Sequence, residues 1–401
     1  MKSLYKNLLL FACFLPLVGF LASSCEKEDN TPVDIGNPQV HYIRSTDPAA
    51  ADSLLVGAFM GSLVAIVGED LGHTVEIWFN DQPATLNPTY ITDRTILVNV
   101  PSSVPVEVSD QIRFVFANGA EMLYDFKVNV PAPILNSIKS EYVEDGDIAV
   151  LHGDFFFEPV TVTFPGGKEG DIAVLEKTQI QVVVPEGAEV GEIVIETNFG
   201  KAVSSFLFRD DRNVVVNFDD LRHRTWNSPI ADVAAGEGDL KPCSGNYTYF
   251  KMESVGAWQW VNELNMMYIA EDGETGRGNV PIFPGSASVN EWGVRFEVNV
   301  PFEWREIPLE IFFAPYGQDH GRDIPVPLTR WSPWEENGVY QTDGWVTVTV
   351  PLTEFDQDKD GNPAELTDLS QYTNLTIMLF GAAENSNDVH IGIDNVRVVK
   401  L

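Results

Sequence analysis

The stretch TRWSPWEENGVYQTDGWVTVTVPL, from Thr329 to Leu352, contains three of the nine tryptophans of this 401-residue chain. After Trp345, valine and threonine alternate, which predicts a β-strand with the valines on one face and the threonines on the other. The opening segment, in which Trp331 and Trp334 flank Pro333, follows no such alternation. We therefore expect these two tryptophans to lie on the surface; the alternative is that they close one end of a β-sandwich.

The same alternation continues through the C-terminal part of the chain, residues 211–401. Turn residues separate the alternating segments and no helical periodicity intervenes, so the sequence predicts an all-β domain, a two-sheet β-sandwich or jelly roll. Strand parity places Trp292 and Phe250 in its core and Tyr249 outside. The predicted strands are Val214–Phe218, Thr248–Met252, Val294–Val300, Leu309–Ala314, Trp345–Val350, Leu375–Phe380 and Val389–Val399.

Aromatic residues are the strongest indication of a binding site in this domain. Eight of the nine tryptophans follow residue 211, and large rigid aromatic faces stack well on the apolar face of a sugar ring. Trp258 and Trp260, in the sequence AWQW, are equally compatible with such a platform and with the core. The candidate ligand-binding residues are Trp331, Trp334, Tyr340, Trp258 and Trp260, with Glu335 and Asn337 as neighbouring hydrogen-bonding groups.

The N-terminus has the pattern of an export signal. Two lysines precede an apolar run, Leu8–Leu21, that is too short to span a bilayer as a mature helix. Small residues then lead to Cys25, and this order resembles the lipobox of bacterial lipoproteins, in which the leader is cut before an acylated cysteine. The acidic residues after Cys25 resemble the tag that exports Bacteroidota lipoproteins to the outer face of the outer membrane. An ordinary secretory signal is the alternative.

These resemblances imply a signal peptide over residues 1–24, lipid attachment at Cys25 to the outer membrane at the cell surface, and a tether over residues 25–37. Removing the two lysines of the leader leaves 23 basic and 59 acidic residues, a net charge of −36 (−34 for the whole chain). Such a charge repels nucleic acids and disfavours polyanionic ligands. With Cys13 in the leader and Cys25 as the anchor, Cys243 has no disulfide partner.

A repeat occupies the middle of the chain. Gly68 of VGED and Gly153 of HGDF are 85 residues apart, and Pro101 and Pro185, each ending a run of alternating valines, are 84 apart. Short strands at this spacing are typical of Ig-like sandwiches. The repeated elements resemble IPT/TIG domains, which implies one such domain over residues 38–131 and a second over residues 132–210. We expect both to act as a stalk and neither to contribute to the site.

Acidic residues suggest two calcium positions. The opening VVVNFDDL and the closing HIGIDNVRV resemble carbohydrate-binding modules of jelly-roll fold, whose first and last strands pair. That resemblance implies a structural Ca²⁺ held by Asp219 or Asp220 with Asp394. Calcium needs six to eight oxygens, so a plain hydrogen-bonded aspartate is as compatible. No cofactor is otherwise required. The second position is a D-x-D-x-D-G loop formed by Asp356, Asp358 and Asp360, for which a solvated turn is the alternative.

Together, the lipobox, the Ig-like repeat and the C-terminal sandwich resemble the surface glycan-binding lipoproteins of Bacteroidota polysaccharide utilisation loci, in particular the second such protein of xyloglucan loci. The resemblance implies non-catalytic capture of a neutral hemicellulose (xyloglucan, β-glucan or mannan), with an outer-membrane glycan transporter complex as a further partner. The alternatives are a glycoside hydrolase of jelly-roll type and an adhesin that binds a protein. No E-x-D-x-x-E, G-x-S-x-G or H-E-x-x-H motif is present.

Overall fold

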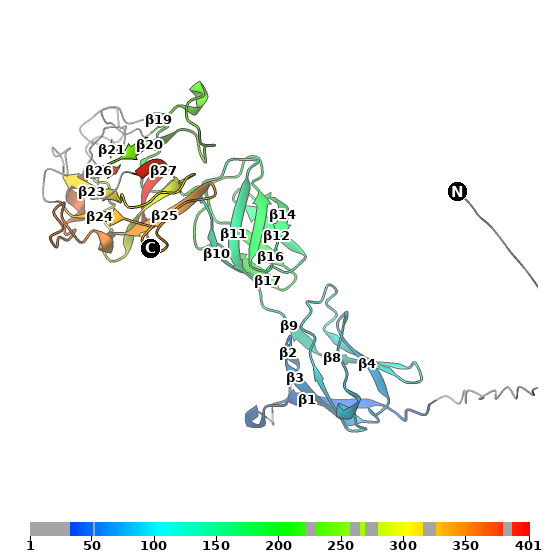
Figure 1. The fold of residues 1–401 in the computed structure, drawn as a ribbon. Helices are drawn as coiled ribbons and strands as arrows, with labels where there is room; N and C mark the ends of the chain where they lie inside the picture. The colour runs from blue at the N-terminus through cyan, green and yellow to red at the C-terminus, as the bar shows by residue number, and fades with distance from the viewer. Residues whose placement is uncertain are drawn as a thin grey trace, which may run out of the picture. The chain divides into compact units, whose positions relative to one another are not determined.

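The computed structural model describes residues 33–50, 53–220, 230–256, 265–268, 280–315, 326–379 and 387–401. These residues form β-strands and short 3-10 helices, and they contain no α-helix, so the predicted all-β class is confirmed. No helix in these ranges is long and apolar enough to cross a membrane. The chain divides into two compact units, residues 1–129 and 130–401, and Figure 1 shows the sheets of each.

The first unit is an Ig-like sandwich. One sheet has the order β1-β3-β6, another has the order β5-β4-β7-β8, and β2 pairs with β9 in parallel. Alternation along β7 buries Ile112, Phe114 and Phe116 in the core. Its elements are β1 (Gln39–Ser45), η1 (Pro48–Ala50), β2 (Gly57–Phe59), β3 (Leu63–Glu69), β4 (Thr74–Phe79), β5 (Gln82–Pro83), η2 (Pro88–Tyr90), β6 (Thr95–Asn99), β7 (Gln111–Phe116), β8 (Glu121–Asp125) and β9 (Lys127–Asn129).

The second unit begins with another Ig-like sandwich. Its sheets have the orders β10-β11-β15-β14 and β13-β12-β16-β17. Leu151, Val162, Phe164 and Ile195 lie in the core between them. The strands are β10 (Ile134–Ile138), β11 (Ile148–Asp154), β12 (Val160–Phe164), β13 (Lys168–Glu169), β14 (Asp171–Leu175), β15 (Gln179–Val183), β16 (Val194–Thr197) and β17 (Gly200–Val203).

The repeated glycine has the same physical role in both Ig-like domains. Gly68 in β3 faces the backbone carbonyl of Gln39 in β1, and Gly153 in β11 faces that of Ile134 in β10. A Cβ atom at either position would collide with that carbonyl oxygen. Both glycines therefore permit a close approach of two strand backbones next to a register shift, a use typical of glycine within strands.

The C-terminal domain is a two-sheet sandwich within the second unit. One sheet has the order β19-β20-β27-β22-β25, with β18 also paired to β27, and the other has the order β21-β26-β23-β24. Its elements are β18 (Val214–Val216), β19 (Ile230–Ala231), η3 (Val233–Ala235), β20 (Tyr247–Val255), β21 (Asn265–Tyr268), β22 (Trp292–Asn299), β23 (Leu309–Pro315), β24 (Leu328–Trp331), β25 (Trp345–Pro351), η7 (Leu352–Glu354), η8 (Leu369–Gln371), β26 (Tyr372–Leu379) and β27 (Asn387–Lys400).

Each predicted strand of this domain has an observed counterpart, and the predicted pairing of the first and last strands is confirmed by β18 and β27. Strands β19, β21 and β24 were not predicted, because each is only two to four residues long. The predicted parity also holds, since Trp292 and Phe250 lie in the core between the sheets. Along β25, Val350 faces this core, whereas Thr347 hydrogen-bonds on the opposite, outer face of the sheet.

That outer face joins the C-terminal domain to the second Ig-like domain. Arg397 of β27 is fully buried, and its Nη2 lies 2.6 Å from Oε2 of Glu141, in the Ig-like domain, and 2.9 Å from Oε1 of Glu297 in β22. The backbone N–H of Thr347 donates to the carbonyl of Lys139 at 2.9 Å. The sequence predicts two equivalent spacers, but the structure builds the second Ig-like domain into the C-terminal domain through a buried charge network.

Candidate functional site

The structure places the predicted aromatic stretch differently from expectation. Trp331 is the last residue of β24, opposite Leu309 of β23, and its half-buried ring faces the core between the sheets. Its centroid lies 5.5, 5.6 and 5.7 Å from those of Phe296, Trp304 and Tyr340. The prediction that Trp331 lies outside any strand and on the surface is therefore wrong. Four strand residues followed by Pro333 are too few to show an alternation in the sequence.

The neighbours of Trp331 are only partly accessible. Trp334 and Tyr340 are half-buried against the same core, and burial raises the pKa of the Tyr340 hydroxyl. Glu335 and Asn337 are exposed. These residues close one edge of the sandwich, so the alternative interpretation fits the geometry better than an open platform. A role in binding for Trp334, Tyr340, Glu335 and Asn337 stays a prediction, and Trp258, Trp260 and Cys25 lie outside the described residues.

The acidic candidates accept hydrogen bonds from the backbone. Asp358 closes a turn, because its Oδ1 accepts the backbone N–H groups of Asp360 and Asn362, each at 2.9 Å. Oδ1 of Asp219 accepts from the backbone N–H of Asn246 at 2.9 Å. Asp394 is fully buried, and burial raises its pKa well above the ordinary value.

Asp356 and Asp220 complete the predicted set, and all six predicted aspartates lie in the described part of the chain. Within that part, no group of three or more His, Cys, Asp or Glu side chains is placed to hold a metal ion. Calcium binding at Asp219 or Asp220 with Asp394, or at the loop of Asp356, Asp358 and Asp360, stays a prediction.

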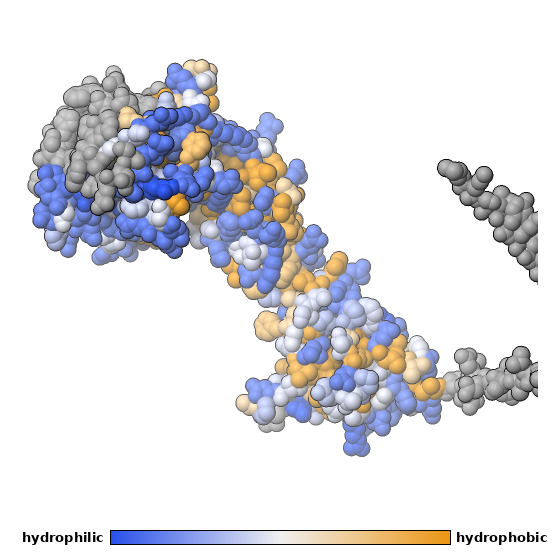
Figure 2. Space-filling view, in the orientation of Figure 1, coloured by the Kyte–Doolittle hydropathy of each residue, from blue (hydrophilic) through white to orange (hydrophobic). Residues whose placement is uncertain are grey.

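The exposed aromatic ring of this domain is one that the sequence analysis missed. Figure 2 shows a mainly hydrophilic surface on the described part of the C-terminal domain in that orientation. Among its described residues, Phe302 is the one aromatic side chain in the exposed class, at 64%. It follows β22 by three residues, after Pro301, and stacks on His390 of β27 with a centroid separation of 5.7 Å and an interplanar angle of 29°. One face of the Phe302 ring therefore packs against the imidazole of His390.

His390 is held in place beneath Phe302. Its side chain is 6% exposed, and Nε2 lies 3.0 Å from Oδ1 of Asp239. The other oxygen of Asp239 pairs with the ammonium of Lys251, which neighbours His390 across strands β20 and β27. Burial lowers the pKa of His390, and Asp239 only partly offsets this effect. Phe302 thus rests on a buried imidazole.

A hollow of about 620 Å³ surrounds Phe302. Its polar lining includes three carboxylates, two cations and the Asn387 amide, and the Arg305 guanidinium pairs with Glu303. Carboxylates and amides accept hydrogen bonds from hydroxyl groups, while the ring offers an apolar face. The excess of carboxylates disfavours an anionic ligand. The remaining lining residues are Lys251, Met252, Glu253, Asp388, Val389 and His390. The arrangement fits a neutral, hydroxyl-rich ring with one apolar face.

The sequence held one weak signal for this site. Phe302 stands in the segment VPFEWRE, one residue beyond the proline that ends an alternating run and directly before a glutamate. An aromatic residue among polar neighbours outside any strand is a candidate for exposure, and Trp331 was chosen by the same criterion. Phe302 differs from Trp331 in its contact with His390, which lies 88 residues further along the chain. No local pattern in the sequence indicates that contact.

Comparisons with known proteins show what the C-terminal domain is similar to. Residues 208–400 match the family described as the surface glycan-binding protein B xyloglucan binding domain. An IPT/TIG domain-containing protein of Bacteroides ovatus is 33% identical over 239 residues, which cover 54% of this chain and 48% of that protein, so the alignment spans about half of the relative.

The surface glycan-binding protein PbSGBP-B of Prevotella bryantii is similar in structure, with a TM-score of 0.65 and 27% identity over 91% of this chain and 99% of that one. The resemblance to surface glycan-binding proteins with IPT/TIG domains is thereby confirmed. Residues 208–400 of this chain are thus similar to the surface glycan-binding protein B xyloglucan-binding domains.

Proposed function

We propose that this protein captures a neutral polysaccharide, xyloglucan or a related β-glucan or mannan, in its C-terminal domain without cleaving it. The observation that carries the proposal is the family match over residues 208–400. The hollow around Phe302 supports it with a chemistry suited to sugars: a pyranose ring stacks its C–H face on the free face of Phe302, and its hydroxyl groups bond to the surrounding carboxylates and amide.

The charge of the protein supports a neutral ligand. The whole chain carries a net charge of −34, and carboxylates also outnumber cations in the lining of the hollow. Uronic-acid polymers would therefore be repelled. Non-catalytic capture is supported by the matched family and by PbSGBP-B, both of which are described as glycan-binding.

A panel of polysaccharides tests binding and catalysis together. In native affinity gels, we expect xyloglucan, mixed-linkage β-glucan or galactomannan to retard the protein, whereas polygalacturonate should not. After prolonged incubation with any glycan that binds, the number of reducing ends should stay at the level of a protein-free control. Retardation by none of the neutral glycans would refute the proposed function, and new reducing ends would show that the protein is a hydrolase.

We further propose that the protein is held at the cell surface through acylation of Cys25, on the strength of the small residues before it and the acidic residues after it. A cysteine that carries several acyl chains anchors firmly, because a single chain binds only marginally. Cys25→Ala should remove the protein from the surface of intact cells, as measured with an antibody against the folded protein. Surface display of the variant at the level of the wild type would contradict the anchor.

A further inference from the structure

The hollow around Phe302 has a second hollow as its neighbour. The second hollow, of about 570 Å³, is lined by Asp239, Asn299, Pro301 and Gln341, among others. Two features join it to the first. Pro301 directly precedes Phe302, and Asp239 is the carboxylate that pairs with Lys251 and lies against His390 of the first hollow. The Gln341 side chain donates to the carbonyl of Pro301 at 2.8 Å, which fixes the wall between them.

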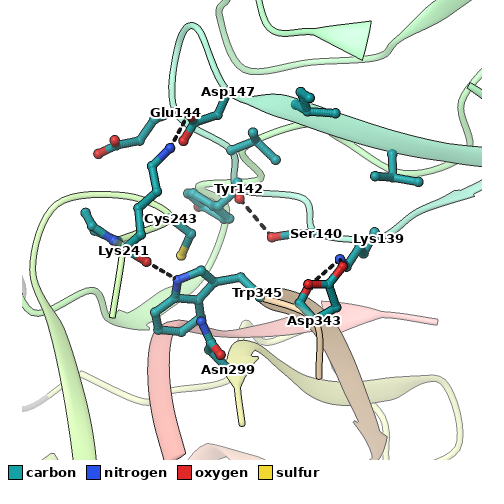
Figure 3. Close-up of a pocket in the computed structure, with 15 residues that line it drawn as sticks. Lys139, Ser140, Tyr142, Glu144, Asp147, Lys241, Cys243, Asn299, Asp343 and Trp345 are labelled. Atoms are coloured by element: carbon teal, nitrogen blue, oxygen red, sulfur yellow. Dashed lines mark hydrogen bonds and ion pairs between the residues drawn. The ribbon is translucent and has the colours of Figure 1, made fainter. Parts of the chain in front are cut away.

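A third space continues the track into the junction between the domains. This crevice, of about 390 Å³, shares Lys241, Asn299, Asp343 and Gly344 with the second hollow. Figure 3 shows Lys241, Cys243, Asn299, Asp343 and Trp345 of the C-terminal domain opposite Lys139, Ser140, Tyr142, Glu144 and Asp147 of the second Ig-like domain. The track therefore starts on one domain and ends between two.

Trp345 and Leu240 form part of the floor of the track. The indole N–H of Trp345 donates to the carbonyl of Lys241 at 2.7 Å. Both Trp345 and Leu240 lie over Gly392 of β27, where a Cβ atom would come within 2.6 Å of Leu240 Cδ1 and 2.9 Å of Trp345 Cη2. Only glycine permits this approach. A preformed floor lowers the ordering cost of binding a ligand.

Ion pairs join the two domains at the end of the track that lies in the crevice. Lys241 pairs with Asp147, and Lys139 lies 3.4 Å from Oδ2 of Asp343, so each ion pair joins one domain to the other. A surface of internally paired charges has little preference for a charged ligand, but its carboxylate oxygens and ammonium groups retain hydrogen-bonding capacity toward hydroxyl groups. Such a surface suits a neutral ligand that is long and rich in hydroxyl groups.

We propose that the glycan-binding surface extends from Phe302 through the second hollow to the crevice at the domain junction, so that an extended neutral glycan chain contacts both the C-terminal domain and the second Ig-like domain. The inference rests on the proposed function and adds the ligand's length and a second contributing domain. From β20 to β25 the track crosses three strand spacings, roughly 14 Å at about 4.8 Å each, which exceeds one sugar ring.

The test compares xyloglucan oligosaccharides of one and of two repeating units by calorimetry with the full-length chain. The wild type should bind the longer one about tenfold more tightly. The double variant Lys241→Ala/Asp343→Ala should lose most of that advantage and retain the affinity for the shorter one. Gln341→Ala, which removes no contact between the domains, should show a smaller loss of the same kind. The control is Lys359→Ala/Asp360→Ala, which removes an exposed ion pair outside the track and should match the wild type.

The outcomes separate this inference from the proposed function. Equal affinity of the wild type for both lengths, or an undiminished length advantage in Lys241→Ala/Asp343→Ala and Gln341→Ala, would overturn the extended track and leave glycan capture at Phe302 standing. Failure of the wild type to bind either oligosaccharide, in a preparation that also fails on the polysaccharide panel, would instead refute the proposed function itself.

Discussion

Glu141→Ala is expected to lower the free energy of unfolding of the second unit by about 3–5 kcal/mol, because it removes one of the two carboxylates that balance Arg397 and Arg295 in a buried network. Arg397 is fully buried, and Glu141, 256 residues away in the sequence, lies 2.6 Å from it. The other oxygen of Glu141 accepts from Arg295 at 2.7 Å. Burial raises the pKa of Glu141, and Arg397 and Arg295 oppose that effect. Glu297 already uses both oxygens, since its Oε1 pairs with Arg397 and its Oε2 accepts from Ser140 and Thr347, so it cannot also take over the contact with Arg295.

Two measurements check this expectation. Urea unfolding gives the free energy directly, and alkylation of Cys243 reports on the junction, because this thiol is buried in the crevice and burial raises its pKa well above the ordinary value. Mass spectrometry of the peptide that contains Cys243 should show faster labelling in Glu141→Ala than in the wild type. Glu186→Ala, at an exposed position of the same Ig-like domain, is the matched control. A Glu141→Ala protein as stable as this control would contradict the role of the network.

The charge network around Arg397 also affects the expected stability of a truncated chain. A fragment that starts near Asp211 lacks Glu141, Lys139 and Asp147, and it exposes an outer sheet face that is buried in the intact protein. The sequence led us to expect that the C-terminal domain needs neither Ig-like domain. From the structure we expect the second Ig-like domain to be needed for a stable C-terminal domain.

Phe302→Ala is expected to weaken binding of xyloglucan by about 10-fold to 100-fold without destabilising the protein. Stacking of one base on an aromatic ring contributes about 1–3 kcal/mol, and stacking of a sugar on Phe302 is expected to be comparable. Because the side chain is 64% exposed, its removal should change the free energy of unfolding by only about 0.5 kcal/mol or less. Calorimetric titration and urea unfolding of the same preparation measure both quantities.

Two further variants serve as controls for Phe302→Ala. Phe59, in the first Ig-like domain, is exposed to a similar extent, at 62%, and Phe59→Ala should bind as the wild type does. Trp331→Ala should show the opposite behaviour, with stability reduced by about 2 kcal/mol because a half-buried ring leaves the core. Unchanged affinity in Phe302→Ala together with lost affinity in a folded Trp331→Ala would return the site to the aromatic stretch that the sequence favoured.

Periodic features of the fold were predictable from the sequence. The alternation through Val294 and Phe296 places both in the core, because it depends only on neighbouring residues. The spacing of Gly68 and Gly153 reveals the repeat, because two similar segments follow each other in register. Strand β24 was not predicted, since four residues before a proline carry too little pattern. Trp331, at the end of this strand, is half-buried, so the predicted exposure of its side chain was wrong.

The functional surface was much less predictable, for a related physical reason. Phe302 is supported by His390, and Arg397 is neutralised by Glu141; each pair combines strands or loops that are far apart in the sequence. A local pattern shows that a residue is aromatic or charged, but it does not show what packs against it. The similarity of the C-terminal domain to surface glycan-binding protein B domains was predictable because its opening and closing strands carry a recognisable pattern, whereas the position of its exposed ring depends on tertiary contacts.

A crystal structure of the full chain with a xyloglucan oligosaccharide of two repeating units tests the central claim most directly. Glycan capture at Phe302 predicts a sugar ring stacked on the face of Phe302 opposite His390, with hydroxyl groups bonded to carboxylates of the hollow such as Glu253 or Asp388. An oligosaccharide bound elsewhere on the C-terminal domain, with the face of Phe302 left in solvent, would contradict it.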